Sequence, residues 1–138
     1  MRTVQDAMIQ PISITVDKSI NDCITLMREK RIDTILVTDD QKKLLGFVDI
    51  EDINDGYRKG MDLVDLMNRD VYRIGVDSKL QDSVRTILKR NIRNIPVIDD
   101  NNKLVGLITR SNLVDIVYDT IWGESQEDES NPLGVEQS

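Results

Sequence analysis

The chain has 138 residues, of which 39% are hydrophobic and only 4% aromatic, so it can bury one compact core or two very small ones. Its formal net charge of −7 argues against a general attraction to nucleic acid or to an anionic membrane surface. The sequence has no histidine, which removes the usual acid–base catalyst and the commonest transition-metal ligand. With only one cysteine the chain cannot form an internal disulfide, and this composition suits the cytosol.

The N-terminal sequence lacks the apolar segment of a signal peptide, and no apolar run reaches the roughly 20 residues that a membrane helix needs. We therefore expect a soluble, cytoplasmic protein. No nucleophile–base pair, metal-ligand set or Gly-rich phosphate loop is visible in the sequence. These observations predict that the chain is not itself an enzyme and carries neither a metal nor a cofactor.

After a lead-in over residues 4–8, residues 13–16 are rich in β-branched side chains and predict a short strand. A helix is expected to begin after Ser19, a favourable N-cap residue with Asp22 three positions further on. Its apolar residues recur at i, i+3, i+4 and i+7, which places them on one helical face: Ile20, Cys23, Ile24 and Met27. The same pattern predicts that Cys23 is a core residue.

Two strands and a second helix are expected to follow. Residues 34–38 predict a strand that ends at Asp39 and Asp40, which we interpret as turn residues rather than metal ligands. Residues 43–49 predict the returning strand, and residues 50–59 a polar-edged helix. The carboxylates around the start of that helix are better explained as an acidic N-terminal cap than as an acid–base pair: Asp49, Glu51 and Asp52.

This series of elements recurs at an offset of about 60 residues. The recurring residues include aspartates and a glycine as well as apolar side chains, so chance agreement is a poor explanation. The second copy predicts a helix with its own apolar stripe, strands over 94–98 and 103–109, and a helix over 110–121; the stripe is Leu80, Val84, Ile87 and Leu88. Its lead-in over residues 63–67 is one residue out of phase, which a one-residue insertion near residues 70–72 explains.

The repeat predicts an α/β (α+β) fold in which two copies pack sheet to sheet around a pseudo-two-fold axis. Repeat 1 should cover residues 1–61 and repeat 2 residues 62–122. Residues 123–138 are acidic and polar and predict a disordered tail. Trp122 just before it is either a docking anchor or a helix-end packing residue. A cleft between the two copies is a favoured kind of ligand site.

The repeat resembles the CBS domain, and the pair resembles a Bateman module. The resemblance covers about residues 4–117. It depends on the lead-ins that end in Met8 and Met67, on the segment from Asn91 to Val97, and on the Gly-apolar-apolar-Thr pattern at residues 106–109. This resemblance implies a regulatory module that binds an adenine-containing ligand and controls a neighbouring enzyme, channel or transporter.

Within that family the chain is similar to the C-terminal CBS pair of the ATPase subunit of bacterial osmoprotectant ABC transporters for glycine betaine, carnitine and choline. The matching segments are residues 31–35 and 46–53, together with the acidic tail. The resemblance implies cyclic di-AMP as regulatory ligand, bound at a homodimer interface and lowering solute uptake. It also implies an upstream ATPase domain and membrane subunits as partners, at the inner face of the cell membrane.

The resemblance places ligand residues in two clefts, each built from both copies. The first cleft is expected to contain Ile12, Ser13, Ile32, Asp33 and Thr34, with Leu107, Thr109 and Asn112 opposite. The second is expected to contain Val71, Tyr72, Ile92, Arg93 and Asn94, with Phe47, Asp49 and Asp52 opposite. The apolar members would sandwich an adenine, Asp52 would accept hydrogen bonds from a ribose, Arg93 would pair with a phosphate, and Tyr72 would stack on a base.

Two departures from the family pattern disfavour an ordinary AMP or ATP site. Asp49 stands where the family usually has Thr or Ser near the phosphate, and Asn112 stands at the ribose-binding Asp position. On balance the second cleft is predicted to be the better base-and-phosphate site.

Two other functions stay open. One is a dimerising module that responds to ionic strength without a small ligand, and the other is an AMP- or ATP-sensing pair of another protein. Several predicted ligand residues also have plain structural explanations: core packing for Ile32 and Ile92, a strand position for Tyr72, and a surface ion pair for Arg93.

Overall fold

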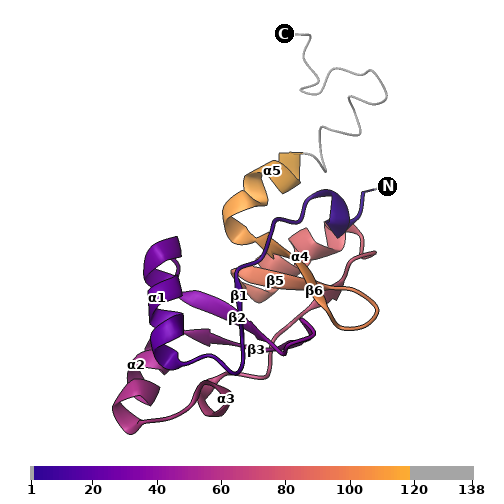
Figure 1. Ribbon diagram of the computed structural model, residues 1–138. Helices are drawn as coiled ribbons and strands as arrows, with labels where there is room; N and C mark the ends of the chain where they lie inside the picture. The colour runs from indigo at the N-terminus through magenta and orange to yellow at the C-terminus, as the bar shows by residue number, and fades with distance from the viewer. Residues whose placement is uncertain (1, 119–138) are drawn as a thin grey trace, which may run out of the picture.

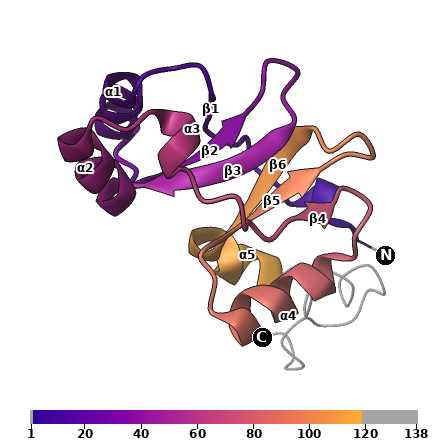
Figure 2. The same cartoon turned by 90° about the horizontal axis from the view of Figure 1, so that it is seen from below.

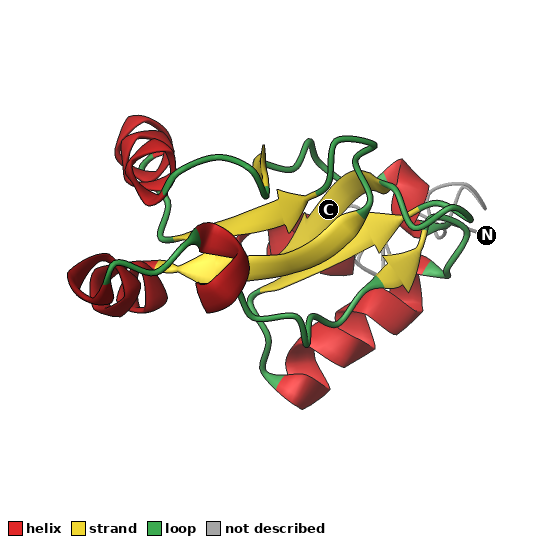
Figure 3. Ribbon diagram, turned by 60° about the horizontal axis from the view of Figure 1, so that its bottom comes forward, coloured by secondary structure: helices red, strands yellow, loops and turns green. Residues whose placement is uncertain are grey.

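The computed structural model describes residues 2–118, without the side chains of Asn112, Leu113 and Ile116. Two three-stranded sheets form the centre, with strand orders β1-β2-β3 and β4-β5-β6 (Figure 1). In each sheet the first strand runs parallel to the second, and the second runs antiparallel to the third. The predicted fold class is therefore confirmed: two small sheets with flanking helices, built twice (Figure 3).

The elements of the two halves follow the same order. The first half contains β1 (Ser13–Thr15), α1 (Ile20–Lys30), β2 (Thr34–Thr38), β3 (Leu44–Asp49) and α2 (Ile50–Lys59). The second contains α3 (Leu63–Leu66), β4 (Ile74–Gly75), α4 (Leu80–Arg90), β5 (Asn94–Ile98), β6 (Leu104–Thr109) and α5 (Leu113–Tyr118). Two 3-10 turns, η1 (Val4–Asp6) and η2 (Arg110–Asn112), precede β1 and α5.

The predicted elements differ from the observed ones mainly at their ends. The first strand is one residue shorter than predicted, and both returning strands begin one residue later. The final helix was predicted from residue 110, but its first three residues form a 3-10 turn. Trp122, the rest of the helix predicted to residue 121, and the acidic tail lie outside the described residues.

The start of α1 carries the predicted capping box. Ser19 Oγ accepts a hydrogen bond from the Asp22 N–H at 3.1 Å, and Asp22 Oδ2 accepts one from the Ser19 N–H at 3.0 Å. The backbone N–H of Ser19, and after it the Ser19 hydroxyl, stabilise the Asp22 carboxylate and hold its pKa below its ordinary value. At the equivalent position of the second half, Lys79 makes no side-chain cap bond to α4.

Replacing Lys79 by serine is expected to stabilise the protein by about 0.5–1 kcal/mol, because a hydroxyl there can complete a capping box with Asp82. The backbone of Lys79 already has the extended conformation of an N-cap residue, with φ −69° and ψ 138°. Urea unfolding of Lys79→Ser and Lys79→Ala measures the difference. A serine variant no more stable than the alanine variant would contradict the prediction.

Each half has its own hydrophobic core between its sheet and its helices. Ile35, Val37 and Val48 are buried in the first, and their repeat equivalents occupy the second: Ile95, Val97 and Ile108. Cys23 is fully buried in the first core, as predicted, and burial raises the pKa of its thiol to about 11. Two residues of the predicted apolar stripes lie outside the cores. Ile24 is 38% exposed and Leu88 is 55% exposed, because each lies at the edge of its helical face.

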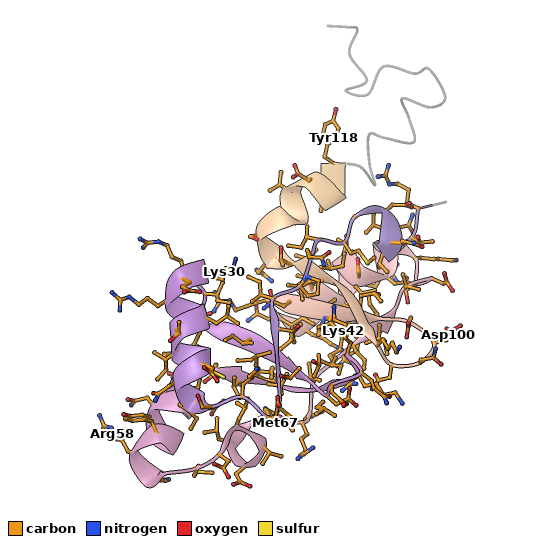
Figure 4. The ribbon with its side chains drawn as sticks, in the orientation of Figure 1. Lys30, Lys42, Arg58, Met67, Asp100 and Tyr118 are labelled. Carbon is orange, nitrogen blue, oxygen red and sulfur yellow. The ribbon has the colours of Figure 1, made fainter. Side chains whose placement is uncertain are left out.

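Each lead-in packs into the core of the other half. Val4 is buried in the core of the second half, with Met8 against it, whereas Leu63 and Met67 are buried in the core of the first half. In Figure 1 the N-terminal turn accordingly lies beside α4, and in Figure 4 Met67 lies near α3. The folded units therefore exchange segments across the predicted boundary between residues 61 and 62.

A glycine in the third strand of each sheet leaves room for the exchanged lead-in. The Asn68 backbone pairs with Phe47 at 2.7 and 2.9 Å, and it lies so close to Gly46 that a Cβ there would collide with the Asn68 carbonyl oxygen. At the equivalent Gly106 a Cβ would collide with the side chain of Met8. The recurrence of this glycine in the repeat thus reflects a close approach of two chain segments.

The two sheets meet face to face and at their hairpin tips (Figure 2). A third apolar cluster joins them through Leu36, Leu44 and Leu104. At the tips, the Leu44 N–H donates to the Asn102 carbonyl at 3.0 Å, and the Leu104 N–H donates to the Lys42 carbonyl at 2.9 Å. These reciprocal bonds are what a pseudo-two-fold axis between the halves requires.

Candidate functional site

Two clefts lie between the halves, one on each side of the contact between the sheets. The first cleft has a volume of about 790 Å³ and is lined by Ile9, Gln10, Ile12, Arg31, Ile32, Asp33, Thr34, Leu36, Arg93, Asn94, Leu107, Thr109, Arg110 and Ser111. The second has a volume of about 860 Å³ and is lined by Asp33, Thr34, Leu36, Phe47, Asp49, Ile50, Glu51, Asp70, Val71, Tyr72, Arg73, Arg90, Ile92, Arg93, Asn94 and Pro96. Both volumes lie in the range typical of small-molecule sites.

The structure brings most of the residues predicted for the first cleft together. Six of the eight line it: Ile12, Ile32, Asp33, Thr34, Leu107 and Thr109. Ser13 does not, because it lies within β1, where it pairs with Leu36 of β2. Nothing is described for the side chain of Asn112, although its neighbour Ser111 lines the cleft and pairs with the Thr109 hydroxyl at 3.0 Å.

Seven of the eight residues predicted for the second cleft line it as well: Phe47, Asp49, Val71, Tyr72, Ile92, Arg93 and Asn94. Asp52 does not line it, because it lies inside the first turn of α2. Asp49 N-caps that helix, and its Oδ1 accepts a hydrogen bond from the Asp52 N–H at 2.9 Å. Burial raises the pKa of Asp52, and repulsion by Asp49 raises it further.

Tyr72 and Arg90 both line the second cleft. The Arg90 guanidinium covers one face of the Tyr72 ring at 4.8 Å from its centroid, and Tyr72 is 38% exposed. Tyr72 precedes β4 rather than belonging to a strand. A planar base could therefore stack on the ring only from the side away from Arg90.

Besides Arg90, a second arginine of this cleft, Arg73, is held by neighbouring groups. Arg73 Nη1 donates to Asn102 Oδ1 at 2.9 Å and to the Leu44 carbonyl at 3.2 Å, which holds it against the hairpin tips. The cleft also contains four carboxylates: Asp33, Asp49, Glu51 and Asp70. Its environment is therefore unfavourable for a ligand with several phosphate charges.

The first cleft has the opposite charge balance. Three arginines line it, Arg31, Arg93 and Arg110, against the single carboxylate of Asp33. Sequence reasoning missed Arg31 and Arg110 as cleft residues, since neither stands at a position carried over from the family pattern. By charge alone the first cleft is the more favourable environment for a phosphate, whereas the sequence predicted the second cleft.

Arg31 has an unusual backbone for an arginine. It ends α1 in the left-handed conformation, with φ 55° and ψ 49°. Its repeat equivalent Asn91 has nearly the same angles, φ 53° and ψ 43°, and asparagine tolerates that region far better. Of the two equivalent strained positions, the one that lines the more cationic cleft is thus occupied by an arginine, Arg31.

The aspartates after the second strand of each half are turn residues, as predicted. Asp39 Oδ1 accepts hydrogen bonds from the N–H groups of Gln41 and Lys43, and Asp99 Oδ1 accepts them from Asn101 and Lys103. Over residues 2–118 no group of three or more Cys, Asp or Glu side chains is arranged to hold a metal ion. Within the same range no helix has the length and apolar character needed to cross a membrane.

The family model of the CBS domain matches this chain twice, at residues 4–58 and 63–119. The chain therefore belongs to the CBS-domain family and carries a tandem pair of these domains. Among solved structures it is similar to Staphylococcus aureus OpuCA, with a TM-score of 0.77 and 61% identity, covering 83% of this chain and 98% of that one. It is also similar to CBSX2 in complex with AMP, with a TM-score of 0.73 and 28% identity, covering 87% and 98% of the two chains.

Characterised relatives narrow the comparison to one kind of CBS-containing protein. The chain is 45% identical over 132 residues to the carnitine transport ATP-binding protein OpuCA of Listeria monocytogenes, covering 91% of this chain and 33% of that protein. It is 45% identical over 116 residues to the glycine betaine/carnitine/choline transport ATP-binding protein OpuCA of Bacillus subtilis, covering 84% and 30%. The chain thus spans about a third of the length of these relatives. The resemblance to osmoprotectant transport ATPases that the sequence indicated is confirmed.

Proposed function

We propose that this CBS pair is the regulatory ligand-sensing module of an osmoprotectant ABC importer. Cyclic di-AMP binds in a cleft between the two halves, at the interface of a homodimer, and lowers solute uptake by the attached ATPase and membrane subunits. The module acts in the cytoplasm, at the inner face of the membrane, and takes no part in catalysis. Its relatives are transport ATPases, and a CBS-pair structure with 28% identity carries AMP.

The observation that carries the proposal is the first cleft. Apolar side chains from both halves, Ile12, Ile32 and Leu107, can hold an adenine, and three arginines surround the same space. Each phosphodiester of cyclic di-AMP carries one negative charge, so the cleft balances this ligand better than a triphosphate. The charge of the first cleft therefore favours cyclic di-AMP over ATP.

We further propose that the module acts as a homodimer. Four helices each expose a large hydrophobic side chain: Ile24 on α1, Tyr57 on α2, Leu88 on α4 and Val114 on α5. Burial of such side chains between two copies would be favourable. Analytical ultracentrifugation with and without nucleotide measures the assembly.

Isothermal titration of the chain with cyclic di-AMP, AMP and ATP tests the ligand. We expect the order cyclic di-AMP, then AMP, then ATP, with affinity falling as salt rises because the arginines contribute electrostatically. No heat and no thermal stabilisation with cyclic di-AMP would remove the ligand assignment. Tighter binding of AMP or ATP would instead indicate an ordinary adenylate sensor.

A further inference from the structure

One ion pair is shared by the two clefts. Arg93 Nη1 stands 3.6 Å from Asp33 Oδ2, and both residues line both clefts. Asp33 and Arg93 occupy equivalent places in the repeat, just after the helix that follows the first strand. They meet at the pseudo-two-fold axis with opposite charges.

The pair is loose enough to open. The two side chains are 76% and 58% exposed, and a separation of 3.6 Å is long for a charge-assisted hydrogen bond. Exposed pairs of this kind are weak, so a competing anion can take the arginine, at a cost that lowers the affinity of the anion by a few-fold. A phosphate entering from either side reaches the same guanidinium.

The two clefts depend on Arg93 to different degrees. In the second cleft Arg73 is hydrogen-bonded to the hairpin tips and Arg90 lies over Tyr72, while Arg93 has only its ion pair with Asp33. In the first cleft Arg31 and Arg110 accompany it, although Arg110 Nη1 also donates to the Ile87 carbonyl at 3.4 Å. A phosphate in the second cleft therefore needs Arg93 more than a phosphate in the first.

We propose that Asp33 is a specificity-determining residue that limits phosphate affinity by holding Arg93, and that this one arginine makes the two clefts compete for a phosphate ligand. The inference rests on the proposed function and extends it to the regulation of the same site. A nucleotide in the first cleft draws Arg93 away from Asp33. The second cleft then keeps four carboxylates without that cation and does not take a second nucleotide.

The test is isothermal titration with cyclic di-AMP, AMP and adenosine as probes. We expect Asp33→Asn to tighten binding of both phosphate probes about five-fold and to leave adenosine unchanged. Arg93→Gln should weaken the phosphate probes about ten-fold. Asp65→Asn, which makes the same charge change at an exposed position on α3, is the matched control and should leave all three affinities unchanged.

The double variant Asp33→Asn with Arg93→Gln separates release of Arg93 from simple repulsion. If Asp33 acts by holding Arg93, the gain from Asp33→Asn disappears in the Arg93→Gln background. A gain that persists there, an unchanged affinity of Asp33→Asn relative to Asp65→Asn, or two independent nucleotides per chain would overturn the inference. If AMP binding shows the expected pattern and cyclic di-AMP does not bind, the proposed ligand fails and this inference stands. If no phosphate probe binds, both fail.

Discussion

Replacing Gly46 by alanine is expected to destabilise the protein by about 2–3 kcal/mol, which is large for the addition of one methyl group. The new Cβ would collide with the carbonyl oxygen of Asn68, which belongs to the backbone and cannot rotate away. The reciprocal bonds between Phe47 and Asn68 must then lengthen or break. The lead-in of the second half would no longer lie against the sheet of the first.

The equivalent substitution in the other half is expected to cost less, about 1 kcal/mol. At Gly106 the colliding atoms belong to the Met8 side chain, which is flexible and can move to another rotamer. Gly75→Ala serves as the control, because its Cβ would meet only Ser78 Oγ, at 3.9 Å. Urea unfolding of the three variants measures the differences.

Gly46→Ala is also expected to affect the second cleft. Phe47 and residues 70–73 line that cleft, so Gly46→Ala should disturb it while leaving the first cleft intact.

Equal losses of stability for Gly46→Ala and Gly106→Ala would contradict the explanation based on backbone collision. Such a result would mean that the lead-in yields as easily as a side chain.

Replacing Arg31 by asparagine is expected to have two opposite effects. Cyclic di-AMP should bind about ten-fold more weakly, because one of the three arginines of the first cleft is lost. The protein itself should become more stable by about 0.5–1 kcal/mol, because asparagine adopts the left-handed conformation with less strain than arginine. The natural chain would thus retain a strained arginine for binding.

The repeat supplies the reciprocal variant. Asn91→Arg places an arginine in the same left-handed conformation at the end of α4, so it should lose stability by a similar amount. Asn91 does not line the first cleft, so this variant should not improve binding there. Thermal unfolding and isothermal titration measure the two properties separately. An Arg31→Asn variant that loses stability as well as affinity would show that the side chain has a packing role.

Much of the local structure could be predicted from the sequence because its signals are local. Ser19 and Asp22 form the expected capping box, Asp39 and Asp99 form the expected turns, and Cys23 lies in the core. The recurrence at about 60 residues predicted two similar halves, and it even located the insertion before β4. The bridges of Ile9 with Leu107 and of Asn68 with Phe47 agree with that one-residue slip.

The exchange of the lead-ins could not be predicted in this way. The apolar residues of a lead-in, such as Val4 and Met8, indicate that they are buried, but not which sheet they are buried against. The neighbouring repeat offers the same apolar surface as its own, so the sequence pattern fits either choice. The close approach at Gly46 and Gly106 is visible only when both segments are in place.

The sequence by itself determined the elements, the duplication and most of the cleft walls, because side-chain periodicity and turn chemistry act over a few neighbouring residues. Only the tertiary structure decided the charge of each cleft. Arg31 and Arg110 come from opposite halves and meet in the first cleft, while the carboxylates of residues 49, 51 and 70 gather in the second. The interaction of two charges depends on the distance between them in space, and for charges on different halves that distance is set only when the halves pack together.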